Sequence, residues 1–87
     1  MYYLYILKSE KINRFYIGIT NNLQRRLRQH DSGLSKYTKT ILPIKLAFFQ
    51  TFEDINEVRK AEKWLKKSKS KSLIQKIIAD GKITKEF

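Results

Sequence analysis

The sequence predicts an α+β fold in which a small three-stranded antiparallel sheet is flanked by helices, in the order ββαβαα. Three segments, residues 2–8, 15–20 and 44–52, are rich in β-branched and aromatic residues, as strands are. Three others carry apolar residues at helical spacing behind a good capping residue. The chain of 87 residues is too short for two independent cores. We therefore expect one domain over residues 1–87.

The first two strands are expected to pair as a hairpin across the polar residues 10–13. A hairpin symmetric about Glu10 and Lys11 would place Tyr5 directly opposite Tyr16 on one face of the sheet. Because side chains alternate along a strand, a set of apolar residues then points to the other face. We expect this set to form the core side of the sheet: Leu4, Ile6, Phe15, Ile17 and Ile19.

A short helix is predicted for residues 22–30, because Asn21 and Asn22 are good N-cap residues. Residues three and four apart share one side of a helix. One stripe of this helix therefore carries Leu23, Arg26, Leu27 and His30.

The polar residues 31–43 are bounded by Gly33 and Pro43, which predicts a loop. Residues 44–52 follow as the third strand, which we expect to be the central strand of the sheet.

Two further helices are predicted near the end of the chain. Asp54 is a good N-cap for a helix near 55–67. Ser70 can cap another helix at about 71–80, where Gly81 is a suitable stop. Their inward faces are expected to consist of Ile55, Val58, Ala61 and Leu65 in the first, and Leu73, Ile74, Ile77 and Ile78 in the second.

The strongest global property of the chain is its charge. Nineteen lysines and arginines face eight acidic residues, which gives a net charge of +11. Such an excess indicates a polyanionic partner, and nucleic acid is favoured over an anionic membrane. The apolar runs are too short to cross a bilayer, and the N-terminus lacks the pattern of a signal peptide. The absence of cysteine excludes disulfides and thiolate metal sites. We therefore expect a cytoplasmic protein, and association with the nucleoid is compatible with its charge.

Glu62 falls within the apolar face of the 55–67 helix, where a carboxylate is costly unless something pairs with it. One interpretation is structural: a salt bridge to Arg26 or Lys66, or a position at the edge of the face. The other is a ligand for Mg²⁺, which often takes only one or two carboxylates from a protein and completes its octahedron with waters and phosphate.

Arg26 and His30 are four residues apart and project side by side from their helix. They can belong to a solvated basic face, or Arg26 can hold a phosphate while His30 donates a hydrogen bond or moves a proton. Tyr5 and Tyr16 are core aromatics in the simplest interpretation. Their shared orientation away from the apolar face favours a second role, because a phenol can orient an attacking water or accept its proton.

Several of these segments together resemble the GIY-YIG nuclease superfamily, and specifically its small stand-alone bacterial members, the UPF0213-like proteins. Residues 3–5 (Tyr-Leu-Tyr) stand where the family has Gly-Ile-Tyr, so that Tyr3 replaces the first glycine. Residues 16–18 are a literal Tyr-Ile-Gly, and 18–30 resemble the segment that follows it, with its arginine and histidine. The resemblance extends over residues 2–78 and includes the segments 36–39, 42–46 and 59–62.

The resemblance implies hydrolysis of phosphodiester bonds with a single divalent metal, Mg²⁺ or Mn²⁺. Carried over by position, Glu62 would bind the metal and Arg26 would hold the scissile phosphate. Tyr5 and Tyr16 would line the site, one of them positioning or deprotonating the water, and His30 would assist. The residues leave open which tyrosine is the base.

These features lead to an endonuclease acting on DNA more readily than on RNA, with a role in repair or recombination. A second hypothesis is a nucleic-acid-binding module of the same fold with little catalysis, and a third is a small structural protein of a ribonucleoprotein particle. A protein partner or a homodimer is compatible with the sequence but has no support in it. The residues expected to contact nucleic acid are Arg25, Arg28, Lys36, Lys39, Lys63, Lys66 and Lys67.

Overall fold

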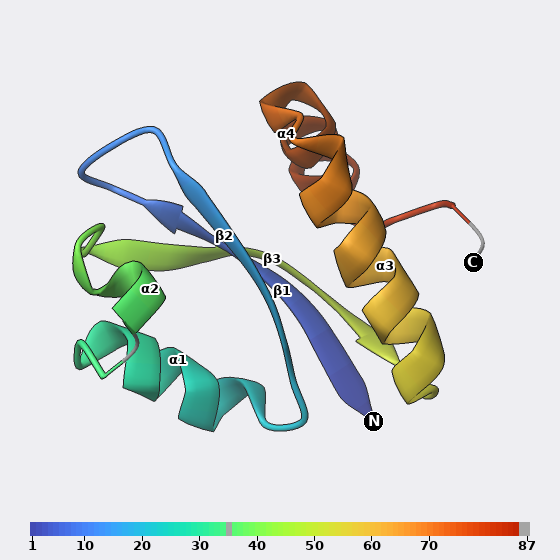
Figure 1. Cartoon of the computed structure of the whole chain (residues 1–87), viewed down its shortest axis with the longest axis horizontal. Helices are drawn as coiled ribbons and strands as arrows, with labels where there is room; N and C mark the ends of the chain where they lie inside the picture. Colours follow the sequence, from blue (N-terminus) through green and yellow to red (C-terminus); the bar gives the residue numbers. More distant parts are fainter. Residues whose placement is uncertain (35, 86–87) are drawn as a thin grey trace.

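A computed structural model describes residues 1–34 and 36–85 and contains one sheet between two layers of helices (Figure 1). This architecture confirms the predicted α+β class and the order ββαβαα, with one additional helical turn, α2, after the first helix. The elements in chain order are β1 (Tyr2–Ser9), β2 (Phe15–Thr20), α1 (Leu23–Asp31), α2 (Lys36–Lys39), β3 (Ile44–Phe52), α3 (Ile55–Ser68) and α4 (Lys71–Asp80).

The central strand of the sheet is β1, because the strands are arranged in the order β2-β1-β3 and both neighbours are antiparallel to it. The expectation that the third strand would be central was therefore wrong. The burial of the two strands gives the reason: four consecutive residues of β1, from Leu4 to Leu7, are buried on both faces of the sheet. By contrast, β3 leaves Leu46 and Phe49 exposed, as an edge strand can.

The register of the hairpin differs by two residues from the predicted one. Tyr5 lies opposite Gly18, and Tyr16 lies opposite Leu7. The strand pairing closes at Ser9, whose N–H donates to the carbonyl of Arg14, so that four residues form the connection. Because a shift of two preserves the alternation of side chains, Tyr5 and Tyr16 still share one face, as diagonal rather than direct neighbours.

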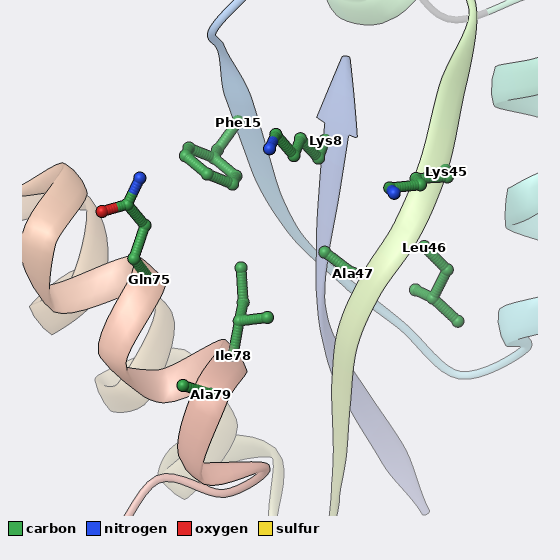
Figure 2. A pocket seen from close by; sticks show the side chains of 8 residues that line it. All are labelled: Lys8, Phe15, Lys45, Leu46, Ala47, Gln75, Ile78 and Ala79. Atoms are coloured by element: carbon green, nitrogen blue, oxygen red, sulfur yellow. The ribbon is translucent and has the colours of Figure 1, made fainter. Parts of the chain in front are cut away.

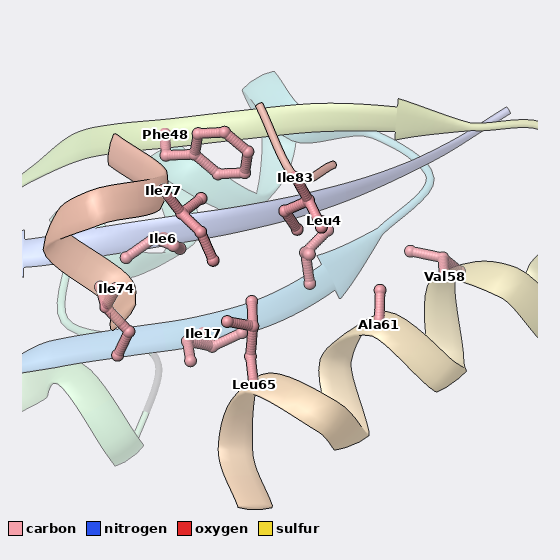
Figure 3. Packing of buried hydrophobic residues seen from close by; sticks show 10 residues of the cluster. All are labelled: Leu4, Ile6, Ile17, Phe48, Val58, Ala61, Leu65, Ile74, Ile77 and Ile83. Carbon is pink, nitrogen blue, oxygen red and sulfur yellow. The ribbon is translucent and has the colours of Figure 1, made fainter. Parts of the chain in front are cut away.

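The main hydrophobic core lies between the sheet and the helices α3 and α4 (Figure 3). The sheet contributes Leu4, Ile6 and Ile17 from the predicted core face, with Phe15 and Ile19 packed at its margin. This outcome confirms which face of the hairpin is apolar. The helices and the C-terminal segment complete the cluster with Val58, Ala61, Leu65, Ile74, Ile77 and Ile83.

Side chains at the helix ends confirm the predicted caps. Asn22 Oδ1 accepts from the Arg25 N–H at 3.1 Å, and Asp54 Oδ1 accepts from the Asn56 N–H at 2.8 Å. Ser70 caps α4 in the same way. Each cap satisfies a backbone donor that the helix itself leaves unpaired.

The segment predicted as a loop, residues 31–43, contains α2. Burial explains this difference: Thr38 in α2 and Ile41 after it are buried against the face of the sheet opposite the main core. Helices α1 and α2 together cover that face, whereas α3 and α4 cover the other (Figure 1). Among the helices of the described residues, none combines the length and apolar character needed to cross a bilayer.

Candidate active site

Tyr5 is the centre of a hydrogen-bonded cluster beneath α1. Its side chain is 1% exposed, although it carries a polar hydroxyl. That hydroxyl lies 2.9 Å from His30 Nε2 and accepts from Arg26 Nε at 3.4 Å. Arg26 and His30 reach the same phenol because they are one turn apart on α1, as their spacing predicted.

His30 extends the cluster to α2. Its side chain is fully buried, and its Nδ1 lies 2.7 Å from the hydroxyl of Thr38. Because Arg26 already donates to the Tyr5 oxygen, the consistent assignment has Tyr5 donating to Nε2 and Nδ1–H donating to Thr38. This arrangement needs a neutral imidazole. Burial lowers the pKa of His30, the nearby charge of Arg26 lowers it further, and Asp31 acts in the opposite direction.

The lowered pKa of His30 predicts a pH dependence of folding. Below about pH 6.5 the unfolded chain takes up a proton on this residue that the folded protein resists, so stability must fall as the pH falls. We expect the free energy of unfolding, measured in urea, to be constant above about pH 6.5 and to decrease toward pH 5 by at most about 1.4 kcal/mol per unit. His30→Gln should remove most of this slope. An equal slope in both proteins would contradict the prediction.

Gly18 is required beside Tyr5 for a steric reason. A Cβ atom at this position would lie 2.5 Å from the Tyr5 hydroxyl oxygen and 2.6 Å from its Cζ, much closer than van der Waals contact. The glycine of the Tyr-Ile-Gly segment therefore makes room for the phenol of the paired strand. Register explains the need, because Gly18 is the cross-strand partner of Tyr5.

Tyr16 and Arg26 form the more accessible part of the cluster. Both side chains are half-buried. The ring centroid of Tyr16 lies 6.3 Å from that of Tyr5 and 5.1 Å from that of His30. A hydrogen bond with Tyr5, and to a lesser extent one with Tyr16, raises the pKa of Arg26. Arg26 also donates from Nη1 to Gln29 Oε1 at 3.0 Å, which holds the guanidinium in place.

Glu62 approaches the cluster from α3, on the other side of the sheet. Its side chain is 25% exposed, and Oε2 forms an ion pair with Lys66 Nζ at 3.1 Å, one of the structural partners considered from the sequence. The Tyr5 phenol is nevertheless within its electrostatic reach. Burial is the largest cause of the raised pKa of Tyr5, and the negative charge of Glu62 also contributes to it. Four predicted catalytic residues, Tyr5, Tyr16, Arg26 and His30, thus contact one another, whereas the charge of Glu62 makes the smallest contribution to the pKa of Tyr5.

The donor set suits a single hard cation. Within residues 1–34 and 36–85, no group of three or more histidine, aspartate or glutamate side chains is placed to hold a metal ion. One carboxylate is sufficient for Mg²⁺, because waters and substrate phosphate oxygens complete its coordination. Glu62 fits this requirement, since its ion pair involves Lys66, which is 54% exposed and can move away.

The predicted nucleic-acid contacts fall on both helical layers. Arg25 and Arg28 are exposed on α1, and Lys39 is exposed at the end of α2. The side chain of Lys36 lies outside the described part of the chain. The remaining three, Lys63, Lys66 and Lys67, are exposed on α3. The described contacts do not bring these two groups together into one patch.

One hollow of the described structure lies away from this cluster. It has a volume of about 430 Å³ and opens between the ends of β1 and β3 and helix α4 (Figure 2). Ile78 and Phe15 point into it, and Lys8 and Lys45 stand at its margin. None of the five predicted catalytic residues lines it.

Three residues of the cluster were not predicted as site residues: Gly18, Gln29 and Thr38. Gly18 and Thr38 occur in segments that carry the family resemblance, and this was the available signal. The sequence signal for Gln29 was weaker: it lies three residues after Arg26 on the same helix and therefore on the same side of it. The contact between Thr38 and His30 depends on how α2 packs, which the sequence of a polar segment does not reveal.

A family model, the GIY-YIG catalytic domain, matches residues 1–77. The chain therefore belongs to the GIY-YIG family.

Within this family, the chain is similar to UPF0213 proteins of bacteria. It is 43% identical over 68 residues to one from Clostridium perfringens, covering 77% of this chain and 72% of the relative. It is 39% identical over 80 residues to one from Listeria monocytogenes, covering 86% and 88% of the two chains. The solution structure of a UPF0213 protein from Bacillus halodurans has a TM-score of 0.56 at 28% identity, covering 91% of this chain and 84% of that one. The expected membership among small bacterial GIY-YIG proteins is confirmed.

Proposed function

We propose that this protein is an endonuclease that hydrolyses phosphodiester bonds in DNA with one divalent metal ion, Mg²⁺ or Mn²⁺. The observation that supports the proposal most strongly is the contact of the Tyr5 hydroxyl with His30 Nε2 and Arg26 Nε, which joins three of the predicted catalytic residues. A role in DNA repair or recombination, inside the cytoplasm, is part of the same proposal. It agrees with the basic charge and with the family.

Burial divides the roles of the two tyrosines. The Tyr5 hydroxyl is sealed from solvent, engaged with His30 and Arg26, and has a raised pKa, so it is a poor acceptor for a proton from water. We assign to it the positioning of Arg26. Tyr16 is half-buried beside the same arginine and is therefore the tyrosine proposed to orient the attacking water and, in its phenolate form, to take the proton of that water.

Arg26 is proposed to stabilise the charge that develops on the scissile phosphate. Its guanidinium is fixed by Tyr5 on one side and Gln29 on the other, so little reorganisation is needed when charge develops. His30 and Thr38 hold Tyr5 from behind, which makes them positioning residues in this scheme. Glu62 would hold the metal ion, which supplies charge neutralisation and Lewis-acid activation when bound.

The exposed lysines and arginines of α1, α2 and α3 are proposed to hold the phosphate backbone. Contacts of this kind give affinity without sequence information and weaken steeply with salt. The same basic side chains would serve a binding module that has lost catalysis, which is the second candidate function. The net charge of +11 supports this binding function. A binding function alone gives no reason for the negative charge of Glu62 to act on the Tyr5 phenol.

Nicking of supercoiled plasmid and of branched DNA tests the proposal. We expect cleavage in Mg²⁺ or Mn²⁺, loss of cleavage when the metal is chelated, and recovery when it is restored. The reason is that the Glu62 carboxylate is itself negative, so it would help to neutralise the phosphate only through a bound metal ion. Binding, followed by fluorescence anisotropy at several salt concentrations, should survive chelation. Salt-dependent binding without cleavage in either metal would favour the binding module.

A further inference from the structure

A second hollow lies on the same face of the sheet as Tyr5 and has no role in the reaction proposed above. Its volume is about 370 Å³, and it opens where α1 begins. Two aromatic residues line it, Tyr3 from β1 and Phe49 from β3. The other lining residues come from the turn between β2 and α1 and from the first turn of α1: Asn21, Asn22, Leu23 and Gln24.

The two aromatic rings lie next to each other. Their centroids are 6.2 Å apart and their planes are tilted by 55°. Phe49 is 49% exposed, whereas Tyr3 is half-buried. A hollow lined by two adjacent aromatic rings, one of them half exposed, offers faces on which another flat ring can stack.

Residues that line the hollow are neighbours of the candidate active site along the sheet and along α1. Phe49 is the cross-strand partner of Tyr5, and Tyr3 follows Tyr5 on the same face of β1. On α1, Leu23 at the hollow and Arg26 at the proposed phosphate site are three residues apart, which is a rise of about 4.5 Å along the helix. Neighbouring nucleotides of one DNA strand are spaced by about 3.4 Å along a helix. A strand at Arg26 can therefore place a nearby nucleotide over the aromatic rings.

The chemistry of the hollow fits an unpaired nucleobase better than an aliphatic ligand. A base has a flat π-face that stacks on aromatic rings, with little dependence on its identity. A base also has hydrogen-bond donors and acceptors along its edge. The side-chain amides of Asn21 and Gln24, which are exposed and line the hollow, can donate to the acceptors and accept from the donors. A paired base would be inaccessible, because its faces are stacked within the duplex.

We propose that Tyr3 and Phe49 form a stacking site for one unpaired base next to the scissile phosphate, so that the preferred substrate carries a single-stranded segment at the cleavage point. This inference rests on the proposed nuclease function, since it uses the position of Arg26 as the phosphate site. It is nevertheless a statement about binding, and binding can be measured in a protein that does not cleave.

Tryptophan fluorescence tests the stacking directly. Phe49→Trp is placed in a Trp64→Phe and Glu62→Gln background, so that the only indole lies in the hollow and the DNA stays intact. We expect single-stranded oligothymidine to quench this fluorescence. An abasic oligonucleotide of equal length, which offers phosphates without bases, and a blunt duplex should bind without quenching. In the otherwise native chain, Phe49→Ala should weaken single-strand binding by about 5- to 150-fold, with duplex affinity unchanged.

Ile12→Trp in the same background is the matched control, because Ile12 is exposed in the hairpin connection at the other end of β1. Its fluorescence should not distinguish oligothymidine from the abasic strand. Equal quenching of Trp at position 49 by both strands, or quenching that follows protein concentration without DNA, would overturn the proposal. If the wild type cuts duplex DNA and oligothymidine binds without quenching, the stacking site is wrong and the nuclease stands. If no DNA binds and none is cut, both fail.

Discussion

Glu62→Gln is expected to lower the rate of phosphodiester cleavage by about 10²–10³-fold, the usual effect of removing one group that stabilises charge in a transition state. Glutamine keeps the shape of the side chain and loses the charge that would hold the metal ion. Because Glu62 is a quarter exposed and its ion pair with Lys66 lies at the surface, the fold should be unaffected. Single-turnover cleavage over a range of Mg²⁺ concentrations measures the effect, and thermal unfolding verifies the fold.

Glu57→Gln provides the control for this variant. Glu57 lies on the same helix, in its first turn, and is exposed. Its substitution changes the net charge by the same amount without touching the cluster, so cleavage should remain near the wild-type rate. DNA binding by Glu62→Gln should be retained or strengthened, since a negative charge near the phosphate site has been removed. Full cleavage by Glu62→Gln would show that the metal is held elsewhere, or that it is not needed.

Gly18→Ala is expected to damage both stability and activity, although only a methyl group is added. The new Cβ would lie 2.5 Å from the Tyr5 hydroxyl oxygen, so either the phenol or β2 must move. Overpacking of this kind costs about 1–3 kcal/mol in buried positions. For a domain of this size, each kcal/mol lowers the Tm by roughly 4–8 °C. Displacing the phenol also breaks its contacts with His30 and Arg26, so cleavage should fall more than the lost stability explains.

Gly81→Ala separates these two effects. Gly81 has a positive φ of 77° at the end of α4, and a Cβ there would meet no atom within 4 Å. The substitution should therefore cost about 1–2 kcal/mol through backbone strain alone. We expect its Tm to fall comparably while cleavage at a temperature below both transitions stays normal. Normal cleavage by Gly18→Ala would mean that the position of Tyr5 does not matter for the reaction.

Much of the fold could be predicted because its signals are local. Strands were recognised from runs of β-branched and aromatic residues, and helix starts from Asn22, Asp54 and Ser70, whose caps the structure contains. Tyr5 and Tyr16 were correctly predicted to share one face although the predicted register was wrong by two residues. A shift by an even number of residues leaves every side chain on the same face of the sheet. The resemblance to the GIY-YIG family, confirmed by a match over residues 1–77, predicted which residues far apart in the sequence belong to one site.

The features that were missed depend on packing between distant segments. The sequence does not state which strand takes the centre of the sheet: β3 is as apolar as β1, and only the burial of β1 on both faces distinguishes them. Nor does it reveal that Tyr5 and His30 are sealed from solvent, because burial here results from α2 closing over the cluster with Thr38. These contacts change the expected roles, since an inaccessible phenol positions other groups rather than meeting water.

The placement of the cluster on two layers has a consequence for how such a protein can change. Tyr5, Tyr16, Arg26 and His30 belong to β1, β2 and α1, whereas Glu62 is carried by α3 on the opposite side of the sheet. The residues proposed to hold the phosphate and the residue proposed to bind the metal ion are thus positioned by packing on opposite faces of the sheet. Under the proposed roles, a single substitution at Glu62 in α3 would stop hydrolysis and leave phosphate binding intact. An enzyme and a DNA-binding protein of this fold would then differ by one carboxylate, and neither state would require the core to be rebuilt.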